Sequence, residues 1–143
     1  LLNDYQICHI CGKGNLKGLN RKGYYETEYA HESLPHFFAM ASIIISRAGA
    51  TTIFEILSVK KPNILIPLPL SASRGDQILN AKEFAKFGFS EVINQEELSF
   101  NVLQNVIYEV LKEKNKYIEN MKKSEIKNPT EKIINVIKNS IKK

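Results

Sequence analysis

Residues 46–55, with the sequence SRAGATTIFE, combine residue types that suit the binding of an anion. The apolar run at residues 43–45 precedes them, as expected for a buried strand. The small residues at 48–50 then place no bulky side chain over the backbone, and Thr51 and Thr52 open a segment with helical spacing of apolar residues. A turn from a strand into a helix leaves backbone N–H groups and the positive end of the helix dipole free to hold an anion. The segment therefore predicts a phosphate site at the carboxyl end of a strand, although similar turns occur in α/β domains that bind nothing.

Glu55, at the end of this stretch, allows two interpretations. Thr52 and Glu55 have the spacing of a capping box, in which the glutamate accepts a hydrogen bond from the Thr52 backbone N–H. In the other interpretation the carboxylate is free to bind a ligand beside the phosphate site. The spacing alone leaves both interpretations open.

Composition indicates one globular domain with a real core. The chain has 143 residues, of which 43% are hydrophobic and 24% charged. No apolar run approaches the roughly 20 residues of a membrane-spanning helix. The chain begins with Leu1 and shows no signal-peptide pattern, so we expect it to be a fragment of a longer protein.

The net charge of +5 is concentrated near the C-terminus, where residues 112–143 carry ten lysines and four glutamates. A lysine-rich helical tail can lie on anionic lipid or nucleic acid, but it can also be a solvated helix face, which we favour. The tail does not interleave aromatic with basic residues, so we expect no nucleic-acid binding.

Cys8 and Cys11 form a Cys-x-x-Cys pair with His9 between the two cysteines. A single pair is half of a zinc site, and a redox pair normally opens a helix, whereas this one closes an apolar strand. We therefore interpret both cysteines as structural thiols in a reducing compartment.

Strand patterns alternate with helix patterns along most of the chain. We expect strands at residues 5–10, 24–29, 43–46, 63–66 and 91–94. We expect a helix capped by Ser33 with Pro35 in its first turn, and helices at residues 51–59, after an N-cap at Ser99, and around Ile133, Ile134, Ile137 and Ile141. A further helix should run from Asp76 to Gly88 with five residues inward: Ile78, Leu79, Ala81, Phe84 and Ala85. This order predicts an α/β fold with a Rossmann-like, mostly parallel sheet that carries helices on both faces.

Several spaced motifs together resemble a known family. They are SRAGATTIFE at residues 46–55, KPNILIPL at 61–68, RGDQILNA at 74–81, GKGN at 12–15 and EYAHE at 28–32. In this order they resemble the C-terminal domain of the MurG family, bacterial transferases of UDP-N-acetylglucosamine in glycosyltransferase family 28. The resemblance covers essentially the whole chain and is densest at residues 43–81.

The resemblance implies the C-terminal half of a two-domain GT-B glycosyltransferase, the half that holds the UDP-sugar donor. The residues that it implies for donor binding are Ala30, His31, Arg47, Ala48, Gly49, Ala50, Thr51, Thr52, Glu55, Asp76 and Gln77. The backbone of residues 48–52 would meet the diphosphate, and Arg47 would stabilise the charge of the leaving group. Glu55 would accept hydrogen bonds from the ribose hydroxyls.

The other two regions would contact the ends of the donor. The backbone of Ala30 and His31 would meet the uracil edge. Asp76 and Gln77 would bind hydroxyls of the N-acetylglucosamine ring; many relatives have two glutamines there, so Asp76 is a departure that keeps an acceptor and loses an amide donor.

For the intact protein, the resemblance implies inverting transfer of N-acetylglucosamine to lipid I, the undecaprenyl-linked acceptor, to form lipid II in peptidoglycan synthesis. Residues 1–121 would bind the donor, and residues 122–143 would form a C-terminal helix that packs toward a missing N-terminal domain. That domain would hold the acceptor and the catalytic base, so this chain would contain no catalytic residue and be inactive alone. The resemblance implies no cofactor or metal, and a cytoplasmic, peripheral location on the inner face of the plasma membrane.

Two alternatives stay open. The chain could belong to another GT-B enzyme that uses a UDP-sugar, such as a lipid glycosyltransferase or an epimerase. It could also be a non-catalytic subunit that binds a nucleotide sugar.

Overall fold

The computed structural model describes residues 1–124, 134 and 137–140. The chain divides into two compact units, Leu1–Ser42 and Ile43–Lys143, and each unit is described by itself. No helix among the described residues is both long enough and apolar enough to cross a bilayer.

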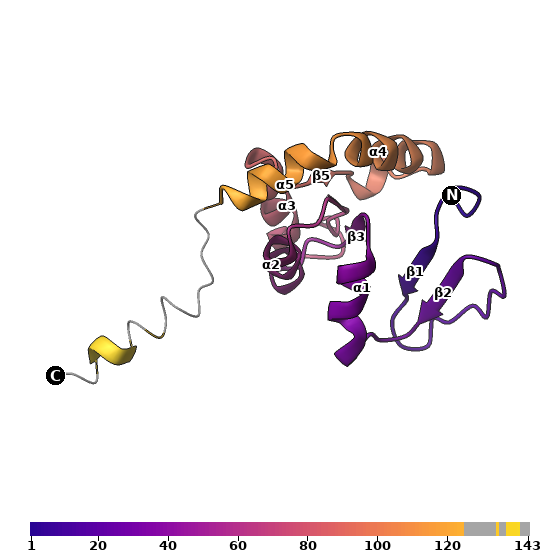
Figure 1. Ribbon diagram of the computed structural model, residues 1–143, viewed down its shortest axis with the longest axis horizontal. Helices are drawn as coiled ribbons and strands as arrows, with labels where there is room; N and C mark the ends of the chain where they lie inside the picture. Colours follow the sequence, from indigo (N-terminus) through magenta and orange to yellow (C-terminus); the bar gives the residue numbers. More distant parts are fainter. Residues whose placement is uncertain (125–133, 135–136, 141–143) are drawn as a thin grey trace. The chain divides into compact units, whose positions relative to one another are not determined.

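The first unit contains a two-stranded parallel sheet (Figure 1). Strand β1 (Ile7–Ile10) pairs with β2 (Tyr24–Thr27), with Ile7 beside Tyr24 and Ile10 beside Thr27. Both strands lie within the ranges predicted from the sequence. A short helix η1 (His31–Ser33) and helix α1 (Leu34–Met40) follow β2.

The prediction that Ser33 caps α1 is only half right. Ser33 precedes the helix, and a proline lies in its first turn as expected, but the Ser33 side chain makes no cap hydrogen bond. Because η1 runs directly into α1, Ser33 has helical backbone angles (φ −84°, ψ −10°), and its hydroxyl instead donates to the Ala30 carbonyl at 2.5 Å.

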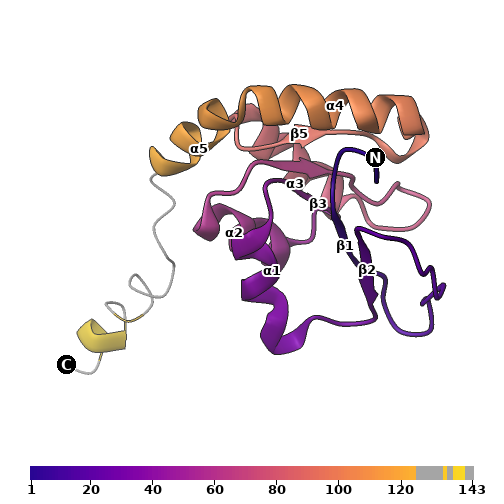
Figure 2. The ribbon, with the colours of Figure 1, turned by 45° about the vertical axis from the view of Figure 1, so that its right-hand side comes forward.

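The second unit is built on three parallel strands in the order β3-β4-β5. They are β3 (Ile44–Ser46), β4 (Asn63–Leu65) and β5 (Glu91–Val92). The helices, in chain order, are α2 (Ala50–Val59), α3 (Asp76–Lys86), η2 (Gln95–Glu97), α4 (Phe100–Lys112) and α5 (Lys114–Lys122), as Figure 2 shows. The parallel α/β architecture predicted from the sequence is confirmed.

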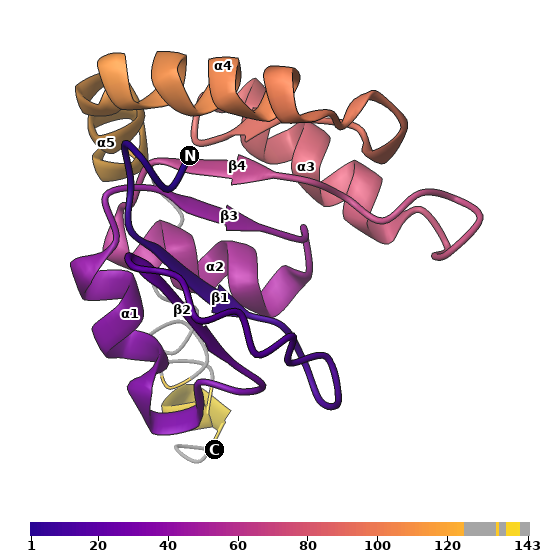
Figure 3. The same cartoon turned by 90° about the vertical axis from the view of Figure 1, so that its right-hand side faces the viewer.

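Helices cover both faces of this sheet. In Figure 3, strands β3 and β4 lie between α2 and α4. Helix α3 packs against α2 through Phe84 and Phe54, whose rings meet edge to face with centroids 5.9 Å apart. The central strand β4 is fully buried, which explains why residues 64–66 form a continuous apolar run instead of alternating with polar residues.

The inward face of α3 differs in part from the prediction. Ala81 and Phe84 are buried and Ile78 is half-buried, but Leu79 is 65% exposed and Ala85 is also exposed. The spacing of three between Ile78, Ala81 and Phe84 defines the buried stripe, and Leu79 lies one residue, or about 100°, away from it.

Two helices close the second unit. Helix α4 begins as predicted at Ser99, whose Oγ accepts a hydrogen bond from the Val102 N–H at 3.3 Å. Helix α5 was not predicted; the Tyr117 hydroxyl joins it to Glu91 at 2.6 Å, and the Asn120 amide joins it to the Gly88 carbonyl at 3.1 Å. Most of the helix expected around Ile133, Ile134, Ile137 and Ile141 lies outside the described residues.

Candidate functional site

Three loops of the second unit meet at one edge of the sheet, because β3, β4 and β5 run in parallel. Residues 47–49 follow β3, residues 66–75 follow β4, and residues 93–94 follow β5. The carboxyl ends of parallel strands are where open α/β sheets bind ligands.

The predicted anion site is formed by the first turn of α2. Gly49 is the N-cap in an extended conformation, and no side chain caps the helix. In the described part of the chain, the N–H groups of Ala50, Thr51 and Thr52 have no acceptor, and the first bond of the helix runs from Ile53 N–H to the Gly49 carbonyl. Three backbone donors at the positive end of a ten-residue helix are therefore available to an anion.

The capping-box interpretation of Glu55 is wrong. The helix begins at Ala50, so Thr52 is its third residue and not its N-cap. Glu55 is half-buried, and its carboxylate makes no hydrogen bond or ion pair with any described residue. It lies one helical turn beyond Thr51 and so shares a helix face with the free N–H groups.

Arg47 ties the three loops together. Its Nη1 donates to the Ile66 carbonyl at 3.1 Å and to Gln95 Oε1 at 2.6 Å. These bonds hold the guanidinium at the sheet edge and leave its other N–H groups without an acceptor in the part of the chain that the structure describes. Gln95 was not predicted, because it is 48 residues from Arg47 along the chain and no local pattern marks it.

Helix α3 presents Asp76 and Gln77 in its first turn, after Gly75 in the left-handed conformation (φ +88°). Asp76 is exposed, and none of the described residues binds its carboxylate. Gln77 Oε1 accepts the Leu68 N–H at 3.1 Å, so the side chain faces the loop after β4 and its amide group remains a donor.

Asn80, one turn further along α3, is a second residue that was not predicted from the sequence. Its Nδ2 donates to the Ala48 carbonyl at 3.0 Å. Ala48 is completely buried, and this is the one hydrogen bond found for its carbonyl among the described residues. Asn80 therefore links α3 to the turn that precedes the free N–H groups of α2.

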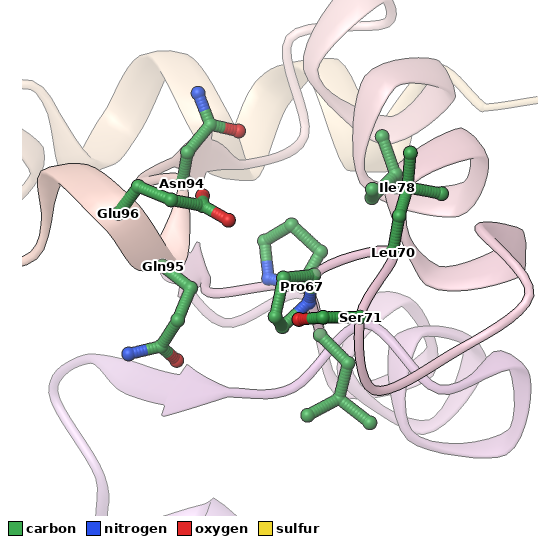
Figure 4. Close-up of a pocket in the computed structure, with 9 residues that line it drawn as sticks. Pro67, Leu70, Ser71, Ile78, Asn94, Gln95 and Glu96 are labelled. Atoms are coloured by element: carbon green, nitrogen blue, oxygen red, sulfur yellow. The ribbon is translucent and has the colours of Figure 1, made fainter.

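A cavity of about 300 Å³ adjoins this edge of the sheet (Figure 4). Asn94, Gln95 and Glu96 lie on one side of it, and Leu70 and Ile78 lie on the other, with Pro67 between them. Gln95, which lines the cavity, also accepts the hydrogen bond from Arg47, the residue that follows β3. No motif in the sequence predicted it.

Ala30 and His31 belong to the first unit, so the structure describes their local geometry and not their placement beside α2. The Ala30 carbonyl accepts both the N–H and the hydroxyl of Ser33, at 2.7 and 2.5 Å. His31 has φ +36°, in the left-handed region that non-glycine residues seldom adopt. Within the described part of the chain, no acceptor is found for the backbone N–H groups of Ala30 and His31.

Comparison with known proteins agrees with this architecture. The model of the glycosyltransferase family 28 C-terminal domain matches residues 2–137. A UDP-N-acetylglucosamine--N-acetylmuramyl-(pentapeptide) pyrophosphoryl-undecaprenol N-acetylglucosamine transferase of Clostridium novyi is 53% identical over 139 residues. The alignment covers 96% of this chain and 39% of that protein. The protein of the same name from Geobacillus kaustophilus is 45% identical over 142 residues, and the alignment covers 98% of this chain and 40% of that protein.

Solved structures show the same fold. The chain superposes on MurG of Acinetobacter baumannii with a TM-score of 0.74 at 21% identity, covering 94% of this chain and 41% of that one. The spinosyn forosaminyltransferase SpnP matches 71% of this chain with a TM-score of 0.59. The chain thus spans about two fifths of the curated relatives' length. Because the family model matches residues 2–137, the chain belongs to the family of proteins that share the C-terminal domain of glycosyltransferase family 28.

Proposed function

We propose that this chain is the donor-binding part of an inverting glycosyltransferase. The intact protein would move N-acetylglucosamine from UDP-N-acetylglucosamine to undecaprenyl-pyrophosphoryl-N-acetylmuramyl-pentapeptide, the reaction for which the relatives are named. The observation that carries the proposal is that α2 presents three N–H groups at its start and the Glu55 carboxylate one turn later, and that none of these groups has a partner among the described residues.

This pairing fits the two halves of a nucleoside diphosphate. The diphosphate is an anion, which the N–H groups of Ala50, Thr51 and Thr52 and the helix dipole would attract. The ribose beside it carries two neighbouring hydroxyls, and each carboxylate oxygen of Glu55 would accept a hydrogen bond from one of them. Arg47 would add positive charge where the departing UDP gains negative charge.

The sugar would lie toward α3. Asp76 would accept hydrogen bonds from sugar hydroxyls, and Gln77 would donate through its amide group because its oxygen already holds the Leu68 N–H. The backbone N–H groups of Ala30 and His31 would meet acceptors on the uracil edge. In this assignment Ala48 and Gly49 form the turn that brings the N–H groups to the ligand.

Transfer needs an acceptor hydroxyl to attack the anomeric carbon while the bond to UDP breaks. We assign donor binding and leaving-group stabilisation to residues 1–121, and acceptor binding and proton removal to a part of the protein outside this chain. Residues 122–143 would pack toward that part. Because the acceptor named for the relatives is linked to undecaprenol, we place the intact protein in the cytoplasm, peripherally bound to the inner face of the plasma membrane.

Calorimetric titration of the chain with UDP-N-acetylglucosamine, UDP-glucose, UDP and ADP tests the donor site. A carboxylate that accepts hydrogen bonds from a ligand contributes about 1.5–3 kcal/mol, so Glu55→Ala should weaken UDP binding by about 10- to 150-fold. The matched control is Glu83→Ala, which removes an exposed glutamate of α3 and should leave UDP binding unchanged.

The ribose assignment has its own test. If Glu55 binds the 2′-hydroxyl, Glu55→Ala should cost less affinity for 2′-deoxy-UDP than for UDP. Equal losses for both nucleotides would refute the ribose contact. Binding of ADP as tight as that of UDP would refute the uridine specificity, and equal binding of UDP-glucose would favour another UDP-sugar enzyme.

A further inference from the structure

The connection between β1 and β2 is an exposed loop. Parallel strands are usually joined by a crossover that contains a helix, but the structure has no helix between Ile10 and Tyr24. Residues 13–22, which we call the basic loop, are all exposed.

Two carboxylates from the β2 side of the sheet hold the backbone of the basic loop in place. Glu26 accepts hydrogen bonds from the N–H groups of Lys17 and Leu19 at 3.2 Å, and Glu28 accepts one from Gly14 N–H at 2.6 Å. Burial works to raise the pKa of Glu26, but the hydrogen bonds from the loop amides outweigh it and the pKa is lowered. These bonds anchor the loop to the β2 side through its backbone and leave the side chains of its cations and leucines unused.

The side chains of the basic loop combine positive charge with apolar surface. Its four cations are Lys13, Lys17, Arg21 and Lys22, and none forms an ion pair with a described residue. Leu16 is 51% exposed and Leu19 is 43% exposed. By contrast, Lys116 and Lys122 of α5 pair with glutamates three residues earlier, so the face of that helix has mixed charge.

We propose that the basic loop is a contact surface for anionic phospholipid, with its cations at the headgroups and its two leucines in the membrane interface. Exposed leucines beside cations fit the surface of an anionic membrane, where the leucines enter the apolar acyl-chain boundary and the cations meet the negatively charged headgroups. The loop contains no aromatic residue on which a base could stack, which disfavours single-stranded nucleic acid. The inference rests on the proposed function, to which it adds the surface that meets the membrane.

A tryptophan placed in the loop reports directly on insertion, because the chain contains no tryptophan. The emission of Leu16→Trp should shift to the blue when phosphatidylcholine vesicles contain phosphatidylglycerol, and should not shift with phosphatidylcholine alone. Tyr108→Trp, on a 60% exposed position of α4, is the matched control and should show no shift. No shift at Leu16→Trp, or equal shifts at both positions, would overturn the proposal.

Charge removal tests the electrostatic part. Lys17→Gln/Lys22→Gln should lower binding to the anionic vesicles about 25-fold, or about fivefold for each cation. Lys114→Gln/Lys123→Gln removes the same charge from the region of α5 and should change binding much less; equal losses would show a general charge effect and overturn the proposal.

The same variants separate this proposal from the donor site. Lys17→Gln/Lys22→Gln should bind UDP as the unmodified chain does. Vesicle binding that persists in a chain unable to bind UDP would leave the loop assignment standing and refute the donor site. UDP binding without any response to anionic vesicles, or a Leu16→Trp response to single-stranded RNA alone, would refute the loop assignment.

Discussion

Replacing Asn80 with alanine should weaken the binding of UDP more than the binding of uridine. Asn80 lies beyond the first turn of α3 and outside the first turn of α2, but its Nδ2 donates a hydrogen bond to the Ala48 carbonyl at 3.0 Å. Ala48 is fully buried and precedes the three free N–H groups of α2. Loss of this bond should allow the turn to move and displace the donors that meet the diphosphate.

The structure sets the size of the effect. A buried acceptor that loses its donor costs about 1–3 kcal/mol, because water cannot replace the partner. If half of that cost is expressed as displacement of the turn, the affinity for UDP falls about 2- to 12-fold, since 1.4 kcal/mol is one factor of ten. The melting temperature should fall by about 4 °C for each kcal/mol lost.

Asn120→Ala is the matched control. Asn120 makes the same kind of bond, from Nδ2 to the Gly88 carbonyl at 3.1 Å, on the side of α5. It should lose similar stability, as measured by thermal unfolding, with no change in UDP affinity. If Asn80→Ala loses stability but binds UDP as tightly as Asn120→Ala does, Asn80 has only a structural role and the reasoning is refuted.

Three further predictions concern stability. Gly88→Ala should lower the free energy of unfolding by about 1–2 kcal/mol, because Gly88 has φ +68° and the new Cβ would lie 2.5 Å from Asn120 Nδ2; unchanged thermal unfolding would contradict this. Ser99→Ala should lower the free energy of unfolding by about 1 kcal/mol, because α4 loses its cap, whereas Ser99→Asp should keep the cap and the stability. Equal melting temperatures for the two variants would show that the cap contributes nothing. Because the pKa of Glu26 is lowered in the folded chain, its carboxylate stabilises the basic loop at pH values above the ordinary glutamate range, and this stabilisation is lost as the pH falls through the lowered pKa. Hydrogen exchange at the Lys17 and Leu19 amides, which Glu26 holds, should therefore accelerate only as the pH falls through that lowered pKa. Exchange that is independent of pH after correction for the intrinsic rate would refute the anchor.

Local patterns were enough to predict the elements that carry the site. The apolar run before Ser46 and the small residues after Arg47 define a strand, a turn and a helix whose signals lie within a few residues of one another. The capping-box question depended on one detail that the spacing could not supply, the residue at which α2 begins. With Gly49 as the N-cap, Glu55 lies beyond the first turn.

Contacts between distant segments could not be predicted in this way. Arg47 and Gln95 are 48 residues apart, and Asn80 and Ala48 are 32 apart, so their pairing depends on the order of strands in the sheet. The basic loop was not predicted either, because its backbone is held by a side chain, Glu26, that accepts the N–H groups of Lys17 and Leu19, and no sequence pattern marks such a contact. The placement of Ala30 and His31 against the nucleotide remains a prediction.

The most direct test of the donor site is an NMR titration that follows the backbone amides of Ala50, Thr51 and Thr52. UDP should shift these three resonances strongly, and uridine, which lacks the diphosphate, should shift them little. Glu55→Ala should weaken the UDP titration while leaving the same three amides as the ones that shift. If UDP binds the chain without moving these amides, the diphosphate does not lie at the start of α2 and the central claim is wrong.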